Sequence, residues 1–201
     1  MGKKGTIFIV SGPSGAGKST ILNEILKTFP NLVYSVSYTT RSPRSNERNG
    51  VHYHFISKDI FLEKITGGEW AEWAEVHGQF YGTLAGDLNR AIDTGLDVIL
   101  DIDVKGAKQL KTSYPEAVLI FITPPSMEKL RERLIKRGTD TPEEIERRLI
   151  NAQKEMSVID KYHYVIINDR LDQAISELKR IIERYHADKK VGTSIRHPSC
   201  A

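Results

Sequence analysis

The residues with the clearest chemical potential form one glycine-rich stretch near the N-terminus, Gly12-Pro13-Ser14-Gly15-Ala16-Gly17-Lys18-Ser19-Thr20. Its glycines allow the backbone to curl tightly, so that several N–H groups converge on an anion. The lysine supplies a mobile cation for the β- and γ-phosphates of a nucleotide, and the hydroxyl of Ser19 can bind Mg²⁺. The spacing therefore predicts a phosphate-binding loop, or P-loop, that binds a nucleotide.

The segments on both sides of this loop are those that a P-loop requires. The apolar run 6–10 predicts a buried strand, and residues 20–29 predict a helix. Such a helix points its unpaired N–H groups and the positive end of its dipole at the phosphates. Glycine-rich turns between a strand and a helix are also common without a ligand. Here the glycines, the lysine and the serine occur together in the right context, which favours the nucleotide interpretation.

A second group of residues has the chemistry of an anion site. Arg41 and Arg44 lie three positions apart in a polar, turn-rich segment, and Tyr53 and Tyr81 add phenolic hydroxyls. Guanidinium groups bind phosphate through paired hydrogen bonds. The alternative is a solvated loop with surface arginines, which we would prefer if the P-loop were missing.

Isolated polar residues complete the candidates in the first half of the chain. Ser37, Glu72, Thr83 and Asp103 form one set. For Glu72, the alternative is that it simply lies on the exposed face of a strand. Asp101 ends an apolar strand and is a candidate to hold Mg²⁺ through water. Its alternative role is to bond the backbone of the P-loop.

Basic residues concentrate in the second half of the chain, at Arg131, Arg133, Lys136, Arg137, Arg147 and Arg148. From sequence alone, a charged and solvated helix surface is as good an interpretation as a phosphate site.

Hydrophobic periodicity predicts how these residues are positioned. The strand-like stretches are 6–10, 33–38, 51–57, 69–76, 96–103, 117–123 and 164–167, and residues 77–83 are predicted as a turn. The helical stretches are 20–29, 58–65, 85–94, 105–112, 126–136, 142–157 and 171–186. Ser126 is a predicted N-cap, and Thr141 to Glu144 form a capping box. Strands that alternate with helices predict an α/β fold with a parallel sheet, into which a small, mostly antiparallel lobe is inserted at 33–83.

Composition limits the class of protein. The chain has 201 residues, of which 39% are hydrophobic and 27% charged, and its net charge is +3. This mild charge suits a small anionic substrate and does not require nucleic acid. The single cysteine, Cys200, excludes an intrachain disulfide, and the spacing of His52, His54 and His77 with it is not that of a metal site. We expect neither a signal peptide nor a membrane span, and hence a cytoplasmic enzyme.

The chain resembles guanylate kinases in a series of motifs that extends over roughly residues 5–187. Besides the P-loop these are Ser35-Val36-Ser37-Tyr38-Thr39-Thr40-Arg41-Ser42-Pro43-Arg44, Asn49-Gly50-Val51-His52-Tyr53, Glu72-Trp73-Ala74, Tyr81-Gly82-Thr83, Leu100-Asp101-Ile102-Asp103 and Arg137-Gly138-Thr139-Asp140-Thr141. The resemblance implies a P-loop NTPase-like parallel sheet core flanked by helices, with a GMP-binding lobe at about 33–95 and a helical lid at about 126–158. The kinase domain would cover 4–187, and residues 188–201 would form a flexible tail.

The resemblance also implies roles for individual residues. The positions that hold the GMP phosphate are Arg41, Arg44, Tyr53 and Tyr81, with Glu47 as a recurrent acidic residue of the same loop. The positions that read guanine are Ser37, Glu72, Thr83 and Asp103, and some members of the family carry Ser in place of Thr83. Arg137 and Arg148 match arginines of the lid that close over the phosphates. Asn168 and Asp169 resemble a segment near the adenine of ATP.

The chemistry of guanine is consistent with these roles. Its Watson–Crick edge offers two donors, N1–H and the 2-amino group, and one acceptor, O6. The carboxylates of Glu72 and Asp103 accept hydrogen bonds, and the hydroxyls of Ser37 and Thr83 can donate to O6. The predicted reaction is the transfer of the γ-phosphoryl group of ATP to GMP, in which Lys18, Mg²⁺ and the arginines at 41, 44, 137 and 148 neutralise charge.

Three alternative functions follow from the same sequence. One is a guanylate kinase-like module that binds proteins without catalysis, although such modules often lose the P-loop that this chain retains. Another is a related kinase of a phosphorylated sugar, which would not need Glu72 and Asp103 to read a purine. A P-loop motor ATPase is a third, and it lacks support because no acidic residue directly follows Asp101.

Overall fold

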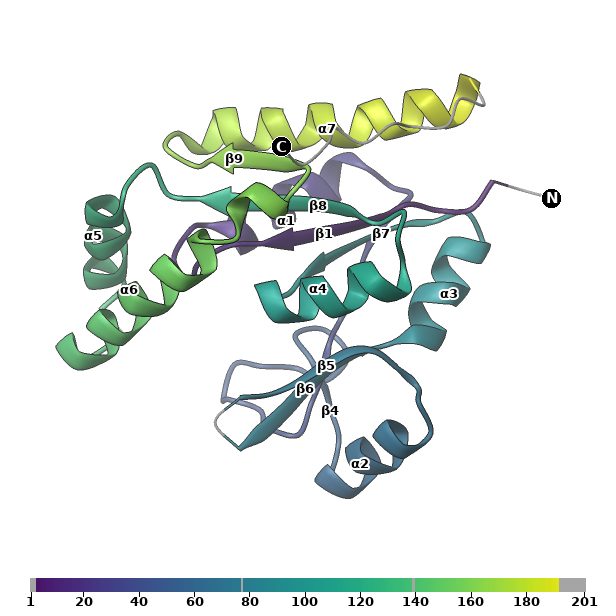
Figure 1. Cartoon of the computed structure of the whole chain (residues 1–201), viewed down its shortest axis with the longest axis horizontal. Helices are drawn as coiled ribbons and strands as arrows, with labels where there is room; N and C mark the ends of the chain where they lie inside the picture. Colours follow the sequence, from purple (N-terminus) through teal and green to yellow (C-terminus); the bar gives the residue numbers. More distant parts are fainter. Residues whose placement is uncertain (1–2, 77, 139, 192–201) are drawn as a thin grey trace. The chain divides into compact units, whose positions relative to one another are not determined.

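The computed structural model describes residues 3–76, 78–138 and 140–191, with side chains as far as 187. A five-stranded sheet has the order β2-β7-β1-β8-β9, and the pairs β2–β7 and β8–β9 are parallel (Figure 1). The strands are β1 (Ile7–Ser11), β2 (Leu32–Tyr34), β7 (Asp97–Asp101), β8 (Val118–Thr123) and β9 (Tyr164–Ile167). Every residue of β1 and β8 is buried, as expected of central strands covered on both faces. The predicted α/β fold with a parallel sheet and flanking helices is confirmed.

A second, four-stranded sheet has the order β4-β3-β6-β5. Its strands are β3 (Tyr38–Thr39), β4 (His54–Phe55), β5 (Trp70–Val76) and β6 (Gln79–Leu84). The β3–β6 and β5–β6 pairs are antiparallel and the β3–β4 pair is parallel. The sheet therefore agrees with the mostly antiparallel lobe that the sequence predicts.

Two predicted elements of this region are wrong. Residues 79–84 form a strand, whereas the sequence predicts a turn over 77–83. Of the residues that suggested a turn, only Gly78 has the positive φ of a turn glycine, +76°. Gly82 lies in the strand, where a Cβ would come 2.9 Å from the backbone oxygen of Glu72 on the neighbouring strand. The single strand predicted over 33–38 is in fact β2 and β3, which belong to different sheets.

The chain divides into two compact units. The first comprises the residues up to 8 together with 31–117. Its helices are α2 (Lys58–Thr66), α3 (Ala85–Asp93) and α4 (Val104–Ser113); α4 packs against β5, and α3 against β6 and β7. Phe61 of α2 is fully buried and stacks on Trp70 and Phe80, at ring-centroid distances of 4.1 and 5.3 Å. These aromatic contacts fix α2 on the second sheet.

The second unit comprises residues 9–30 and those from 118 onward. Its helices are α1 (Lys18–Thr28), α5 (Met127–Arg137), α6 (Pro142–Met156) and α7 (Leu171–Val191), with a 3-10 turn at Ile159–Lys161. In this unit α1 packs against α7, and α7 runs along β9 (Figure 1). The predicted N-cap at Ser126 and the capping box at Thr141 are both confirmed. The predicted tail begins inside α7, and its residues 192–201 lie outside the described part of the chain.

The pair of helices α5 and α6 has its own small hydrophobic core. The core residues are Leu130, Leu134, Ile145, Leu149 and Ala152. Gly138 ends α5 in the left-handed region, with φ +68°, as a C-terminal glycine commonly does. The predicted lid region is thus a helical hairpin that packs on itself.

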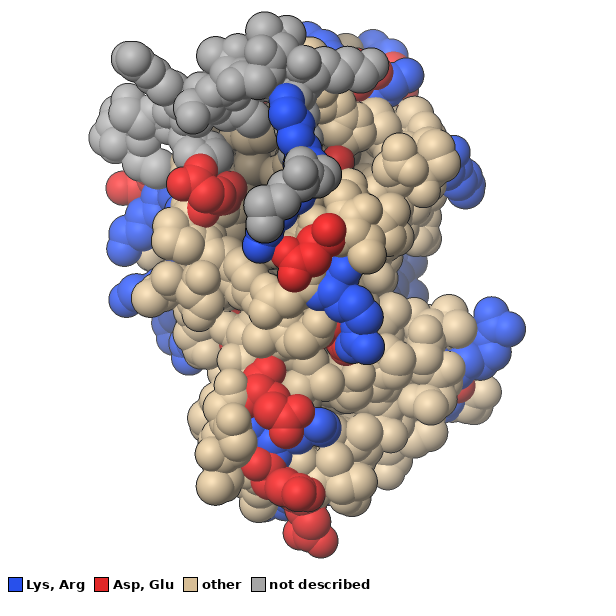
Figure 2. Space-filling model, turned by 90° about the vertical axis from the view of Figure 1, so that its right-hand side faces the viewer, with Lys and Arg blue, Asp and Glu red and all other residues tan. Residues whose placement is uncertain are grey.

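Charged side chains of both signs are interspersed on the face shown in Figure 2. Both blue and red groups occur on the tan surface, and several red groups lie together at the lower left of the view, in a chain with 29 basic and 26 acidic residues. This surface matches the mild net charge of the sequence. Within the described residues, no helix is long and apolar enough to cross a membrane.

Candidate functional site

The P-loop of the sequence analysis connects β1 to α1. Gly12, Gly15 and Gly17 all have positive φ, at 140°, 94° and 93°. A Cβ on Gly12 would lie 1.9 Å from the backbone oxygen of Ile122, so the position has no room for a side chain. Gly17 is the N-cap of α1 and makes no side-chain capping bond, which leaves the helix N-terminus open to an anion.

Lys18 is folded back over this loop. Its Nζ donates to the backbone oxygen of Gly12 at 2.5 Å and lies 3.4 Å from that of Pro13. A cavity of about 480 Å³ opens beside the loop, lined by Ser14, Gly15, Gly17, Lys18, Ser19, Thr20, Arg133, Leu134 and Arg137. The loop, the helix N-terminus and several cations therefore face one space, which suits a polyphosphate.

Arg148 of α6 reaches the same loop. Its Nη1 donates to the Oγ of Ser14 at 2.6 Å, and its Nη2 pairs with Asp140 at 2.9 Å. The side chain of Asp140 is only 6% exposed. The structure thus brings both predicted lid arginines, Arg137 and Arg148, to the P-loop.

The basic residues of α5 and α6 resolve into two groups. Arg131 pairs with Glu146 and Arg147 with Glu144, both at the helix surface. Arg133 and Arg137 line the P-loop cavity instead. The helix-surface interpretation therefore holds for Arg131 and Arg147, while the position of Arg133 and Arg137 is compatible with a phosphate site.

The predicted anion site of the first unit is ordered by Glu47. Both carboxylate oxygens of Glu47 accept bonds from Arg41, at 2.9 Å each, and one also accepts from the backbone N–H of Arg44 at 2.8 Å. These bonds lower the pKa of Glu47 to about 2 and raise that of Arg41. Glu47 therefore fixes the loop that carries both arginines.

Aromatic rings surround Arg41. Its guanidinium carbon lies 5.5 Å from the ring centroid of Tyr53 and 5.8 Å from that of Phe55. Tyr53 and Tyr81 meet edge to face at 6.0 Å, and burial raises the pKa of Tyr53. Arg41, Tyr53 and Tyr81 thus form one cluster, and the exposed residue Arg44 is connected to it through the bond from its backbone N–H to Glu47.

Glu72 and Thr83 lie opposite one another on β5 and β6. The hydroxyl of Thr83 donates to Oε1 of Glu72 at 2.7 Å, and the two residues are 1% and 7% exposed. Oε2 of Glu72 faces the first turn of α4, since a Cβ on Gly106 would lie 2.8 Å from it. The alternative that Glu72 simply lies on the exposed face of a strand is therefore excluded.

Asp103 stands beside this pair and caps α4. Its Oδ1 accepts from the backbone N–H groups of Lys105 and Gly106, at 3.0 and 2.8 Å. Burial, and then the negative charge of Asp103, raise the pKa of Glu72 to about 7, although the bond from Thr83 acts in the opposite direction. Two carboxyl groups thus occupy one small region, where a ligand with several donors would relieve their repulsion.

The raised pKa of Glu72 has a measurable consequence for stability. Between the ordinary pKa of 4.5 and the folded value of about 7 the folded protein binds more protons than the unfolded chain, so its free energy of unfolding falls as pH rises. We expect Glu72→Gln to stabilise the protein relative to wild type by up to about 3 kcal/mol at pH 8, and by much less at pH 5. Thermal unfolding at both pH values measures this. Glu75→Gln, on the exposed end of the same strand, is the control, and equal shifts for Glu72→Gln at both pH values would contradict the argument.

The remaining predicted residues lie at or near the ends of strands or helices. Ser37 is half-buried in the segment that connects β2 to β3, and its backbone oxygen accepts from His54. Asp101 ends β7. Burial, and then the charge of Asp101, raise the pKa of Tyr34. Ser19 lies in the first turn of α1, with its side chain exposed.

The histidines that can be assessed have structural contacts. His52 accepts a bond from the backbone N–H of Arg48, and His54 stacks on Tyr38 at 4.5 Å. His77 and Cys200 lie outside the described residues. Among the residues that are described, no three His, Cys, Asp or Glu side chains form a metal cluster.

Sequence reasoning did not select two polar residues that contact the P-loop site. Asp140 pairs with Arg148, and it stands within a motif quoted above, so the motif itself was a signal. Asn168 donates to the backbone oxygen of Ala16 at 2.7 Å. The only signal for Asn168 was the resemblance to a segment near adenine, which did not indicate a contact with the loop.

The fold and the P-loop cavity define the chain as a P-loop nucleotide-binding protein of the α/β class. The family model described as guanylate kinase matches residues 4–185. A guanylate kinase of Geobacter metallireducens is 49% identical over 182 residues, covering 90% of both chains. One of Carboxydothermus hydrogenoformans is 50% identical over 179 residues, covering 89% of this chain and 88% of the relative.

A solved structure agrees with these sequences. The crystal structure of guanylate kinase from Anaplasma phagocytophilum superposes with a TM-score of 0.74 at 34% identity, covering 92% of this chain and 88% of the other. The chain belongs to the guanylate kinase family, and the predicted family and fold are confirmed. It is a nucleotide-binding kinase that uses ATP.

Proposed function

We propose that this chain holds ATP at residues 12–20 and GMP at the residues gathered around Arg41 and Glu72. The reaction is that of its family: the γ-phosphoryl group of ATP passes to a phosphate oxygen of GMP, giving ADP and GDP in purine nucleotide metabolism. The observation that carries the choice of GMP is the buried Glu72–Thr83 pair beside Asp103. A P-loop alone would serve many phosphoryl donors and acceptors.

The donor phosphates would bind to the backbone of the P-loop and to Lys18. Ser14, Gly15, Gly17 and Thr20 line the cavity, so their N–H groups or hydroxyls are available to phosphate oxygens. Gly12, Pro13 and Ala16 shape the loop from its buried side. Because Nζ of Lys18 lies against backbone oxygens, it needs only to exchange a carbonyl for a phosphate when ATP arrives.

The phosphate of GMP would bind to Arg41, Arg44, Tyr53 and Tyr81. Glu47 acts in this proposal by holding Arg41, and not by contacting the nucleotide itself. A guanidinium held on one side by a carboxylate presents a fixed donor geometry to a phosphate on its other side. The exposed Arg44 is free to follow the ligand.

The guanine base would lie against Glu72 and Asp103. Its N1–H and 2-amino donors match the oxygens of these carboxylates, and the hydroxyl of Ser37 suits O6. The single O–H of Thr83 donates to Glu72 in the structure, so Thr83 would donate to O6 only by giving up that bond. Two donors close to Glu72 favour its charged form and would return its pKa toward the ordinary value. Binding of the base therefore compensates the cost of burying this carboxylate.

Catalysis in this proposal consists of alignment and charge neutralisation. The nucleophile is a phosphate oxygen of GMP that is already anionic near neutral pH, so no general base is needed. Lys18, Arg41, Arg44, Arg137 and Arg148 supply the positive charge. Arginines contribute about 10³–10⁵-fold to phosphoryl transfer in the best cases.

Magnesium is the cofactor that we propose to accompany ATP. Mg²⁺ prefers oxygen ligands and is usually held by phosphates, waters and few protein groups. The exposed hydroxyl of Ser19 lines the P-loop cavity beside Lys18, so it fits such a ligand, and Asp101 is proposed to act through water. When bound, the ion would neutralise charge on the β- and γ-phosphates.

The proposal includes the setting of the enzyme. A kinase domain over 4–187 would contain a GMP-binding lobe at about 33–95 and a lid at about 126–158. Since both substrates are free nucleotides, we expect neither a nucleic acid nor a membrane as partner, and we expect the enzyme to work in the cytoplasm.

A panel of nucleoside monophosphates tests the proposed substrate. Each would be incubated with ATP and Mg²⁺ while ADP release is followed by a coupled assay. We expect turnover with GMP well above that with AMP, CMP or UMP. No ADP release despite GMP binding would favour the non-catalytic binding module, and activity on a sugar phosphate but not on GMP would favour the other kinase.

We expect the lid to close when both nucleotides are bound. Closure would exclude water from ATP and bring Arg137 and Arg148 onto the phosphates. Backbone hydrogen exchange should therefore slow within residues 126–158 when a non-hydrolysable ATP analogue and GMP are added together. The buried strand β8 serves as the internal control. Unchanged exchange in α5 and α6 would show that these helices are not a lid.

A further inference from the structure

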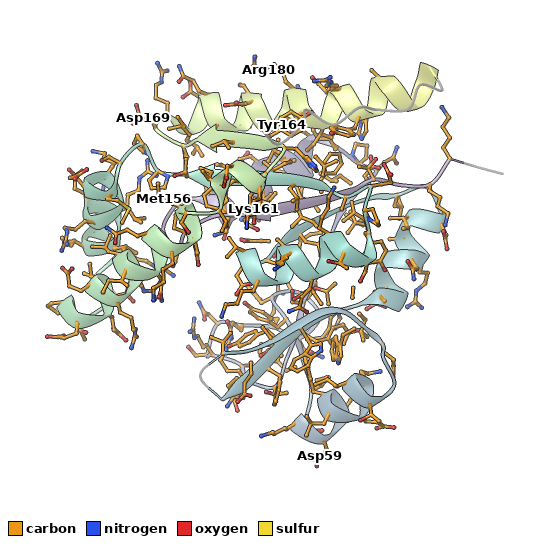
Figure 3. All side chains as sticks on the ribbon, in the orientation of Figure 1. Asp59, Met156, Lys161, Tyr164, Asp169 and Arg180 are labelled. Carbon is orange, nitrogen blue, oxygen red and sulfur yellow. The ribbon has the colours of Figure 1, made fainter. Side chains whose placement is uncertain are left out.

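Asn168 is a buried side chain that reaches the P-loop from the end of β9. It is only 5% exposed, and its Nδ2 donates to the backbone oxygen of Ala16 at 2.7 Å. A carbonyl oxygen can only accept, so the amide must present its NH₂ group to Ala16, and its orientation is thereby fixed. Figure 3 shows the neighbouring Asp169 in the loop between β9 and α7.

The backbone of Asn168 is fixed by hydrogen bonding, as its side chain is. Its N–H donates to the oxygen of Thr123 at 2.8 Å, which extends the pairing of β9 with β8. A Cβ on Gly17 would lie 2.4 Å from Nδ2 of Asn168, so the amide fills the space beside that glycine. Asn168 therefore contacts two consecutive residues of the P-loop from a rigid position.

The geometry of the peptide bond gives this contact a consequence. In a planar trans peptide the C=O of one residue and the N–H of the next point in opposite directions. When Asn168 holds the oxygen of Ala16 on the buried side, the N–H of Gly17 points away from it. Gly17 lines the P-loop cavity, so this N–H is directed toward the place where phosphate would bind.

Asn168 also holds a cation at the same cavity. Its backbone oxygen accepts from Nη2 of Arg133 at 2.7 Å, and Arg133 lines the cavity with Lys18 and Arg137. One residue thus restrains both an N–H donor of the loop and a guanidinium.

We propose that Asn168 is a positioning residue of the donor nucleotide site: its amide sets the direction of the Gly17 N–H, and its backbone places Arg133. The inference rests on the proposed binding of ATP at the P-loop. Asn168 contacts no reacting group, and its effect passes through the P-loop backbone. Replacing its amide donor should weaken binding of ATP and ADP and leave binding of GMP unchanged.

The test compares Asn168→Asp and Asn168→Ala with wild type by calorimetric titration of ADP and, separately, of GMP. Asn168→Asp keeps the size of the side chain but places a carboxylate against a carbonyl oxygen, so we expect ADP affinity to fall about tenfold or more. Asn168→Ala only removes the hydrogen-bond donor, so its ADP affinity should fall less than that of Asn168→Asp. The KM for ATP should rise more in Asn168→Asp than in Asn168→Ala, while the KM for GMP should change less than about twofold in both.

Two control variants separate a positioning effect on the P-loop from a general loss of stability. Asn89→Asp makes the same chemical change at an exposed site, and the carboxylate can still accept from Tyr114. Leu178→Ala removes a fully buried side chain of α7, so it lowers stability without touching the P-loop. We expect both to keep the wild-type KM for ATP.

The outcomes are distinct. If both Asn168 variants bind ADP as wild type does, or if ADP and GMP affinity fall together, the inference is wrong. If Asn168→Asp does not fold, Asn168→Ala decides by the same two titrations. If wild type itself fails to bind ADP, the proposed function fails. If wild type binds ADP and Lys18→Met does not, but the Asn168 variants do, only the positioning role is lost.

Discussion

Lys18→Met is expected to lower kcat by about 10²–10³-fold while the protein stays folded, as is found when one preorganised charge or donor is removed from a transition state. Methionine has a similar length and apolar stem, so the packing around α1 should survive. The lost ammonium group is the one that the structure holds at the P-loop, 2.5 Å from the oxygen of Gly12. A steady-state assay with saturating ATP and GMP measures the effect, and thermal unfolding with a GMP titration verifies the fold.

Lys27→Met is the matched control for this variant. Lys27 is on the same helix but forms an exposed pair with Glu24, and such surface pairs contribute about 0–1 kcal/mol to stability. Its turnover should equal that of wild type. A folded Lys18→Met protein with near-normal turnover would show that the loop does not use this cation for the transferring phosphoryl group.

The elements with strong local signals could be predicted from the sequence. The P-loop has glycines at 12, 15 and 17 directly before Lys18 and Ser19, and all three take the positive φ that glycine allows. The capping box at Thr141 and the buried strand at 118–123 are likewise local patterns. In each case the sequence itself contains the constraint that fixes the structure.

The second sheet was harder to predict because its strands depend on partners that are distant in sequence. β3 has two residues, and it exists through pairing with β4 and β6. From sequence, Gly82 looks like a turn residue. The structure shows instead that a side chain there would collide with the neighbouring strand. Short strands of this kind have too little periodicity for a sequence pattern to reveal them.

Parts of the candidate site could likewise be predicted from the sequence, and parts could not. Lys18 and the arginines could be chosen from motifs, but the clamp that Glu47 forms on Arg41 follows only from the folded loop. Asn168 is separated from Ala16 by most of the chain, and no spacing rule connects them. Contacts through which one residue positions another over a long range carry no local signal, so the resemblance named Glu47 and Asn168 without indicating these contacts.

Selectivity for GMP over AMP is the prediction that tests the base-reading residues. Adenine offers an acceptor at N1 where guanine offers a donor, so a carboxylate facing it would lose a hydrogen bond. A buried charged group without its partner costs about 1–3 kcal/mol or more, which corresponds to about tenfold or more in kcat/KM for each contact. We therefore expect wild type to prefer GMP strongly.

Glu72→Gln should narrow that preference, and the structure indicates how. Because the hydroxyl of Thr83 donates to Oε1, the amide oxygen of the variant would keep that position and the NH₂ group would replace Oε2. A donor would then face the base, where it suits adenine N1 and opposes the donors of guanine. The kcat/KM for GMP should fall about tenfold or more, and the ratio of GMP to AMP should fall with it.

Asp103→Asn and Arg44→Ala complete the comparison. Asparagine is as good an N-cap as aspartate, so Asp103→Asn should keep α4 intact while one acceptor for guanine loses its charge. Arg44→Ala should lower kcat/KM for GMP and AMP by the same factor, because both nucleotides carry the phosphate that it is proposed to bind. The effects of Glu72 and Asp103 need not add, since the two carboxyl groups interact. If the carboxylate variants reduce both activities equally, as Arg44→Ala does, then these residues support the site without reading the base.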